Sequence, residues 1–212
     1  MNEFLVVHPC NIFSHDTAVA PFDLVDMYEL PNTDLTLYKA IILLNYVDQD
    51  FLLEEKQLIE QFLADGKLVC FFGNLVTPWL PGQELFVPKE INWHGDYNVT
   101  IAKPHPIFDG VIEEHMTTNK GVKGFFARGH HPAPQGAEVL LTLPAGEEIT
   151  YINRNSTNGT IFMHVGFCFF DFSGNGGMRP ETKKTTDRIP AQMLAWAQEE
   201  LARLAKGEKI DA

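Results

Sequence analysis

Continuous apolar runs, without the alternation of a half-buried strand, mark four segments of this chain. They span residues 4–8, 39–45, 67–72 and 160–166. Strands that are covered on both faces show such runs, and they are typical of parallel sheets in α/β proteins. We therefore expect these four segments to be strands that lie next to one another in one largely parallel sheet.

The segment between the second and third runs predicts a helix. Asp48 or Asp50 can cap its first turn, and Gly66 can end it. One apolar stripe follows its length, formed by Leu58, Ile59, Phe62 and Leu63. A strand, a helix and a strand in this order predict a right-handed βαβ unit.

A second helix is predicted near the carboxyl terminus, at about residues 190–206. Pro190 suits the first turn of a helix, and Gly207 lies just beyond the last turn. Apolar residues recur along it with spacings of three and four residues, at Leu194, Ala197, Leu201 and Leu204. We expect this stripe to pack on an apolar surface of the same chain or of a second chain.

Prolines change the character of the chain between residues 77 and 136, where they separate short apolar pieces. This segment predicts a proline-rich insert of loops and short strands. Residues 139–143 and 149–152 predict a hairpin, and residues 25–30 predict a further strand at the edge of the sheet. Since no linker separates these pieces, we expect one α/β domain over residues 1–212.

Composition narrows the classes of partner. The chain has 212 residues, is 45% hydrophobic and carries a net charge of −12, which disfavours nucleic acid and anionic membranes. No apolar run approaches the roughly 18 residues that span a bilayer. The amino terminus lacks the basic start of a signal peptide, and three widely spaced cysteines form no disulfide framework. We expect a soluble cytoplasmic protein.

Asn74 is the first candidate for a ligand-binding residue. It follows the third apolar run, which ends in the turn Gly73-Asn74. Open α/β sheets bind ligands beyond the carboxyl ends of their strands, so the side chain of Asn74 is expected to line a pocket.

Arg128, His130 and His131 form a polar cluster and are further candidates for ligand binding. Histidine hydrogen bonds could simply hold this loop. A metal or anion site is the alternative, with a contribution from His105, His164 or Asp171. Adjacent histidines diverge in an extended chain, and no H-x-H or H-E-x-x-H spacing accompanies them, so we expect no metal and no cofactor.

His164 lies within the last apolar run. A histidine in such a strand is either a core residue satisfied by hydrogen bonds or a buried general base. No G-x-S-x-G motif supplies a serine for such a base to activate. We retain His164 as a candidate ligand-binding residue.

Several segments together resemble the class I glutamine amidotransferase-like superfamily, particularly its ThuA-like and non-amidotransferase branches. They are residues 38–43, 64–69, 105–110, 149–151 and 158–166. The resemblance covers about residues 2–170. It implies a flavodoxin-like three-layer sandwich with helices on both faces of the sheet, and many members of that branch lack the catalytic apparatus.

Catalytic members of that superfamily place a cysteine in a sharp turn, in the pattern G-x-C-x-G. Neither Cys10 nor Cys70 has glycine at either position, and although Gly166 precedes Cys168, Phe170 replaces the second glycine. No histidine follows Cys168, whereas the superfamily's catalytic histidine follows its cysteine. The nucleophile is therefore not carried over.

The sequence favours a non-catalytic amidotransferase-like domain that binds a small ligand or a partner protein. The alternative is a hydrolase-type enzyme that uses His164 or the cluster of Arg128, His130 and His131. A carbohydrate-related substrate would rest on analogy with related domains alone. Whether the chain forms a homo-oligomer stays open.

Overall fold

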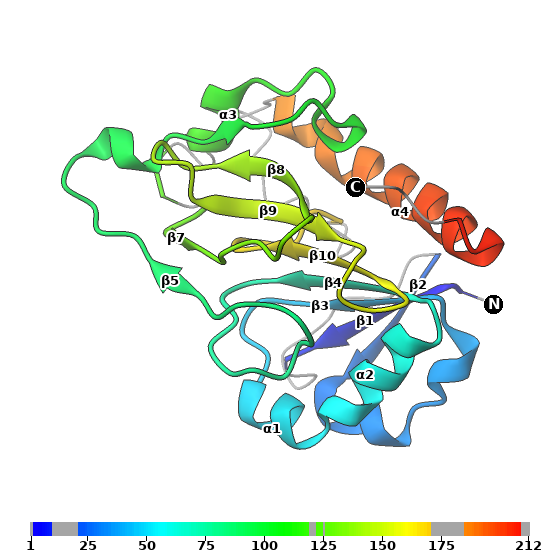
Figure 1. The fold of residues 1–212 in the computed structure, drawn as a ribbon. Helices are drawn as coiled ribbons and strands as arrows, with labels where there is room; N and C mark the ends of the chain where they lie inside the picture. The colour runs from blue at the N-terminus through cyan, green and yellow to red at the C-terminus, as the bar shows by residue number, and fades with distance from the viewer. Residues whose placement is uncertain (1, 10–20, 119–121, 125, 171–184, 209–212) are drawn as a thin grey trace.

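The computed structural model describes residues 2–9, 21–118, 122–124, 126–170 and 185–208 (Figure 1). The main sheet has eight strands. In spatial order they are β2 (Phe22–Asp26), β1 (Phe4–His8), β3 (Ala40–Leu43), β4 (Leu68–Phe72), β10 (Thr160–His164), β9 (Glu148–Asn153), β8 (Glu138–Thr142) and β6 (Thr100–Ile101). Neighbouring strands from β2 to β10 are parallel, and those from β10 to β6 are antiparallel.

The four apolar runs form β1, β3, β4 and β10, and these strands are neighbours in the sheet. Their prediction as one parallel group is confirmed. Alternate residues of each strand belong to opposite faces: Phe4 and Val6 lie in one hydrophobic cluster, whereas Leu5 and Val7 lie in the other. Because both faces are covered, both sets of side chains are apolar, and the run is continuous.

Helices cover both faces of this sheet. On one face lie α1 (Gln49–Glu54) and α2 (Lys56–Ala64), and on the other lies α4 (Ile189–Lys206). A short helix, α3 (Glu113–Thr117), lies near the β8 edge (Figure 1). Five 3-10 segments are also described: Met27–Asn32, Leu35–Leu37, His94–Tyr97, Pro106–Phe108 and Thr185–Arg188. None of the described helices is long and apolar enough to span a membrane.

The predicted helix between β3 and β4 is two helices that meet at Glu55. Asp48 caps the first, because its carboxylate accepts hydrogen bonds from the N–H groups of Asp50 and Phe51, both at 3.1 Å. Gly66 follows the second helix with φ at +75°, a conformation that suits glycine. The predicted start and end are therefore confirmed, whereas the break was not predicted.

The predicted edge strand over residues 25–30 is displaced. β2 covers Phe22–Asp26, and a 3-10 helix occupies Met27–Asn32. Asp26 starts this helix, since its carboxylate accepts from the Tyr28 N–H at 3.0 Å. Residues 27–30 of the predicted strand therefore lie in a capped 3-10 helix. The position of β2 at the edge of the sheet agrees with the prediction.

The predicted C-terminal helix is confirmed as α4, and Gly207 ends it in the left-handed conformation. It packs on the sheet of its own chain through Met193, Trp196, Ala197 and Leu201. Leu194 and Leu204, which we placed on the apolar stripe, are only half-buried. The buried face is therefore rotated relative to the predicted one.

The proline-rich insert consists mainly of loops and short strands, as expected. It holds β6 and the two-stranded ribbon of β5 (Val87–Pro88) and β7 (Gly129–His130). It also holds α3, which was not predicted. After the insert, the predicted hairpin forms as β8 and β9, which extends the parallel strands with an antiparallel region.

Candidate functional site

A cavity of about 470 Å³ lies beyond the carboxyl ends of β3, β4 and β10. This edge of an open α/β sheet is where such folds bind ligands. Residues from the loops that follow the three strands line it, together with residues of the insert: Asn45, Tyr46, Gln49, Gly73, Asn74, Gly124, Phe126, Ala127, Arg128, Val165, Gly166 and Phe167.

The loop after β3 presents Asn45 and Tyr46 to this cavity. Tyr46 has φ at +72°, which is rare for a residue with a side chain, and the residue is 81% exposed. Gly73, after β4, has φ at +131°, and a Cβ there would lie 3.1 Å from the Cα of Asn45. Glycine therefore allows the two loops to approach each other closely.

Gln49, in the first turn of α1, holds the loop that follows β4. Its side-chain Nε2 donates to the carbonyl oxygen of Asn74 at 2.6 Å, and its Oε1 accepts from the Val76 N–H at 2.8 Å. The Oε1 also accepts from the indole N–H of Trp79 at 3.2 Å. One carboxamide thus fixes the backbone at Asn74, and the Asn74 side chain has no hydrogen-bond partner among the described residues.

Arg128 reaches the same cavity from the insert. Its Nε donates to the carbonyl oxygen of Gly124 at 3.0 Å, which orients the guanidinium. No carboxylate in the described part of the chain forms an ion pair with it, and its two Nη groups have no hydrogen-bond partner there. Arg128 is exposed, so its positive charge faces the solvent in the cavity and not a carboxylate of the described residues.

His131 and His164 are both fully buried and do not line the cavity. The Nε2 of His131 accepts from the Leu75 N–H at 2.9 Å, and the Nδ1 of His164 lies 2.7 Å from the Thr150 hydroxyl. Burial lowers the pKa of each imidazole to about 3. Both rings are therefore neutral at physiological pH, and they support the strand ends beneath the cavity.

Not all of the histidines that were expected to lie close together do so. His130, in β7, is half-buried, and its Nδ1 has no hydrogen-bond partner among the described residues. His105 lies elsewhere, with its ring 6.1 Å from that of Trp196 in α4, and Asp171 lies outside the described residues. No group of three metal-ligating side chains occurs in the part of the chain that the structure describes.

The turn after β4 carries Gly73 and Asn74 rather than a nucleophile, and a loop follows it instead of a helix. Cys70 lies inside β4 with no exposed surface, and burial raises the pKa of its thiol well above the usual value. Cys168 is half-buried against the hydrophobic cluster on the α4 face. Cys10 lies outside the described residues.

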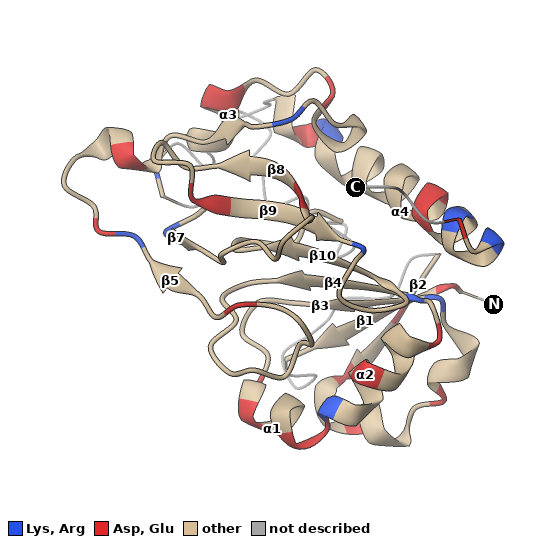
Figure 2. Ribbon diagram, in the orientation of Figure 1, with Lys and Arg blue, Asp and Glu red and all other residues tan. Residues whose placement is uncertain are grey.

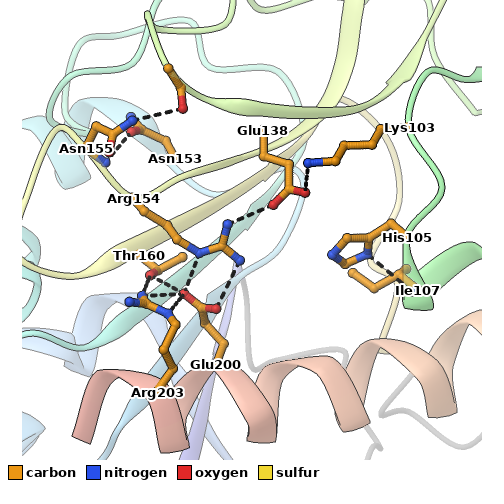
Figure 3. Close-up of polar contacts among 11 residues, drawn as sticks. Lys103, His105, Ile107, Glu138, Asn153, Arg154, Asn155, Thr160, Glu200 and Arg203 are labelled. Atoms are coloured by element: carbon orange, nitrogen blue, oxygen red, sulfur yellow. Dashed lines mark hydrogen bonds and ion pairs between the residues drawn. The ribbon is translucent and has the colours of Figure 1, made fainter. Parts of the chain in front are cut away.

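A second polar cluster, which the sequence interpretation missed, lies at the opposite end of β10 (Figure 3). Glu200 of α4 is 4% exposed and receives a bidentate pair of hydrogen bonds from Arg154, at 2.9 and 3.0 Å. Its Oε1 also accepts from Arg203 at 2.7 Å and from the Thr160 hydroxyl at 2.6 Å. Arg154 in turn donates to Glu138 at 2.8 Å. We call these residues the Glu200 cluster.

Hydrogen bonds to Arg154, Arg203 and Thr160 outweigh the effect of burial and lower the pKa of Glu200 to about 2. The cluster joins α4 to β8, β9 and β10 (Figure 3). A sequence signal was present, because Glu200 falls between Ala197 and Leu201 on the apolar stripe of its helix. A charged residue at such a position indicates a buried partner of opposite charge.

The sequence interpretation also missed Asn45, Tyr46 and Phe167 as cavity residues. Asn45 is the last residue of the second apolar run, and Asn74 lies just after the third, so the rule that selected Asn74 could have found it. Arg128 and Asn74 were both candidates, but 54 positions separate them along the chain, and only the fold shows that they line one cavity.

No protein-family model matches this chain, and no curated protein matches it. Among solved structures, the cytoplasmic protein STM3548 from Salmonella typhimurium has a similar fold. The TM-score is 0.55 at 12% identity, and the match covers 92% of this chain and 98% of that one. This likeness concerns the fold alone.

Two further structures resemble the chain more weakly. The cytoplasmic protein STM1381 from Salmonella typhimurium LT2 matches with a TM-score of 0.44 at 12% identity, over 99% of this chain and 100% of that one. The exo-beta-1,4-mannosidase Op5Man5 from Opitutaceae bacterium strain TAV5 matches with a TM-score of 0.39 at 12% identity, over 97% of this chain and 35% of the mannosidase. These TM-scores support no conclusion about this chain.

Proposed function

We propose that this protein is a non-catalytic, amidotransferase-like domain that binds a small molecule in the cavity beyond β3, β4 and β10. The observation that carries the proposal is the chemistry of the lining. The described residues around the cavity offer carboxamides, a guanidinium, a phenol and apolar groups, but no thiol, aliphatic hydroxyl, imidazole, carboxylate or amine side chain. Such a set can bind and orient a ligand, but it supplies no general base and no activated nucleophile of the usual types.

The fold assignment within this proposal is a flavodoxin-like three-layer sandwich, a single domain over residues 1–212, and we propose that it works in the cytoplasm. Two observations support the fold assignment. The parallel strands β2, β1, β3, β4 and β10 have helices on both faces, and the cavity lies at their carboxyl ends, as in open α/β folds. A small molecule suits the cavity better than a protein partner, because its volume lies within the range of small-molecule sites, roughly 300–1,000 Å³.

The geometry does not favour the hydrolase alternative. A general base must lie within hydrogen-bond reach of the proton that it abstracts. His164 has no exposed surface, and its Nδ1 is occupied by the Thr150 hydroxyl. His131 is equally buried, and its Nε2 is occupied by the Leu75 N–H. Arg128 lines the cavity, but its guanidinium offers only N–H donors and no acceptor that could take up a proton.

A cavity-filling variant tests the binding proposal. We would measure the melting temperature of the protein with a library of small neutral, anionic and cationic compounds, and repeat the hits with Asn74→Trp. Compounds that bind the folded state should raise the melting temperature, at 100 times Kd by the equivalent of about 2.7 kcal/mol. The indole ring in Asn74→Trp should abolish these shifts, because Asn74 is exposed and lines the cavity. Shifts that persist in this variant would contradict the proposal.

The non-catalytic part of the proposal has its own test. Thiolate catalysis needs an accessible thiol with a lowered pKa, whereas Cys70 is buried and its pKa is raised. Alkylation of the native protein at neutral pH should modify Cys70 far more slowly than a free thiol. A cysteine that reacts faster than a free thiol, together with a glutaminase or esterase activity that the alkylation removes, would overturn the proposal.

A further inference from the structure

We propose that the ligand of this cavity is a small organic monocarboxylate with an apolar body, whose carboxylate pairs with Arg128. This inference rests on the proposed function, since it names the chemistry of the molecule bound at the same site. It follows from the charge at one side of the cavity, the carboxamides beside it and the apolar groups around it.

The charge of Arg128 is the first argument. The chain has a net charge of −12, so carboxylates are abundant, yet none among the described residues pairs with this guanidinium. By contrast, the guanidinium of Arg154 contacts the carboxylates of both Glu138 and Glu200. A cation left unpaired at the wall of a cavity is suited to an anionic group supplied by a ligand.

The orientation of Arg128 is the second argument. The hydrogen bond from Nε to the carbonyl oxygen of Gly124 fixes one edge of the guanidinium and leaves both Nη groups without described partners. Two parallel N–H groups match the two oxygens of a carboxylate. The carboxamides of Asn45 and Asn74 line the same cavity, have no described hydrogen-bond partners, and can donate further N–H groups to those oxygens.

The surrounding charges favour a singly charged ligand over a phosphate dianion. Arg128 is the one cationic side chain among the described residues of the lining. Asp48 and Asp50 flank the lining residue Gln49, and acidic residues also mark the adjacent α1 and α2 segment (Figure 2). A second negative charge on the ligand would find no second cationic side chain among the described residues of the lining to offset it.

Part of the cavity wall is apolar. Phe126, Ala127 and Val165 line it with little exposed surface, whereas Tyr46 and Phe167 are 81% and 40% exposed and offer aromatic surface to a ligand. Contact between such groups and an apolar ligand body lowers the free energy of binding. Contact with a hydrated polar body does not. Acetate alone would leave the exposed rings of Tyr46 and Phe167 in water, so a larger acid is expected.

Matched compounds separate the parts of this inference. Isothermal titration would compare phenylacetate with its neutral isostere phenylacetamide, with acetate and with phenyl phosphate, all at low salt. We expect phenylacetate to bind at least 10-fold more tightly than each of the other three. Arg128→Met should remove the preference for phenylacetate over phenylacetamide, whereas Arg128→Lys should retain part of it because the charge remains.

Arg188→Met is the control for a general loss of positive charge. Arg188 is exposed at the start of α4 and does not line the cavity, so this variant should bind phenylacetate like the original protein. Equal binding of acid and amide, tighter binding of phenyl phosphate, or unchanged binding by Arg128→Met would each overturn the inference. If phenylacetamide binds and Asn74→Trp blocks it, the proposed function stands while the inference fails. If none of the compounds binds, the inference fails, and the library screen with Asn74→Trp decides the proposed function separately.

Discussion

Arginine side chains lie near both ends of β10, but in opposite environments. Beside Thr160, at the start of the strand, Arg154 and Arg203 are nearly buried and pair with Glu200. Beyond His164, at the other end, Arg128 faces a cavity with no described carboxylate partner. A buried cation requires a partner within the fold, whereas a cation at a cavity wall can be hydrated and exchange water for a ligand. The first end therefore serves stability and the second is available for binding.

The largest effect should come from Glu200→Ala. This change leaves the guanidinium groups of Arg154 and Arg203 without their buried partner, and breaking such a pair costs about 3–5 kcal/mol. Urea denaturation would measure the loss in the free energy of unfolding. Glu60→Ala is the matched control, because Glu60 pairs with Lys56 on an exposed helix surface, where a pair contributes at most about 1 kcal/mol. Equal losses for both variants would remove the contrast between the two kinds of site.

Acid should weaken the cavity end through its buried histidines. The pKa of His131 and of His164 is about 3 in the folded protein, below the usual value of 6.5, so the unfolded chain binds more protons as the pH falls. Their contribution to stability is complete above pH 6.5 and is lost between pH 6.5 and 3. Each histidine should lower the free energy of unfolding by about 1.4 kcal/mol per pH unit within that window.

Two substitutions test this acid dependence. His131→Gln can keep the acceptor for the Leu75 N–H, and His164→Asn can keep an acceptor near Thr150, but neither new side chain titrates. Urea denaturation at pH 7 and at pH 5 should show a smaller difference in each variant than in the original protein. An undiminished difference would assign the acid sensitivity to other groups, such as His105, whose pKa is also lowered by burial.

A smaller effect is expected where the loops after β3 and β4 meet. Gly73→Ala would place a Cβ 3.1 Å from Asn45 in a backbone conformation that residues with side chains rarely adopt. Strain of this kind costs about 1–3 kcal/mol. Gly146→Ala is a useful comparison, because its φ is also positive, at +89°, but a Cβ there has no atom within 4 Å. Thermal unfolding should show a greater loss for Gly73→Ala than for Gly146→Ala.

The smallest effect on stability is expected for Arg128→Met. Because no described carboxylate depends on Arg128, the change should alter the free energy of unfolding by no more than about 0.5 kcal/mol. Urea denaturation without ligand would check this value. A loss comparable with that of Glu200→Ala would show that Arg128 stabilises the fold, and the distinction between the two ends of β10 would fail.

The sequence predicted the parallel half of the molecule better than the edge that holds the candidate site. Buried runs such as residues 67–72 identify strands because covering both faces demands apolar side chains at every position. The break at Glu55 has no such signal, since its neighbours continue the helical pattern on both sides. Likewise, Asp26 directs the chain into a 3-10 helix through one side-chain hydrogen bond, which local propensity does not reveal.

The candidate site was predicted residue by residue but not as an arrangement. The position of Asn74 follows from a general rule about strand ends, and the structure places it at the cavity. His130 and His131 are adjacent in the sequence, yet one is half-buried in β7 and the other fully buried, because successive residues of an extended chain point in opposite directions. Contacts with residues distant in sequence decide which of the two adjacent histidines is buried in the core.

The pairing of β4 with β10 has a consequence for how the chain reaches its folded state. Cys70 lies opposite Phe162, 92 positions further along, whereas β1 and β3 pair residues about 36 positions apart, such as Phe4 and Ala40. Closing the longer loop costs more conformational entropy, and pairings of this range slow folding. We expect pulse-labelled hydrogen exchange to show protection of β1 and β3 before β10. Because the cavity needs the loops after β3, β4 and β10 together, ligand affinity would then appear only in the last step of folding.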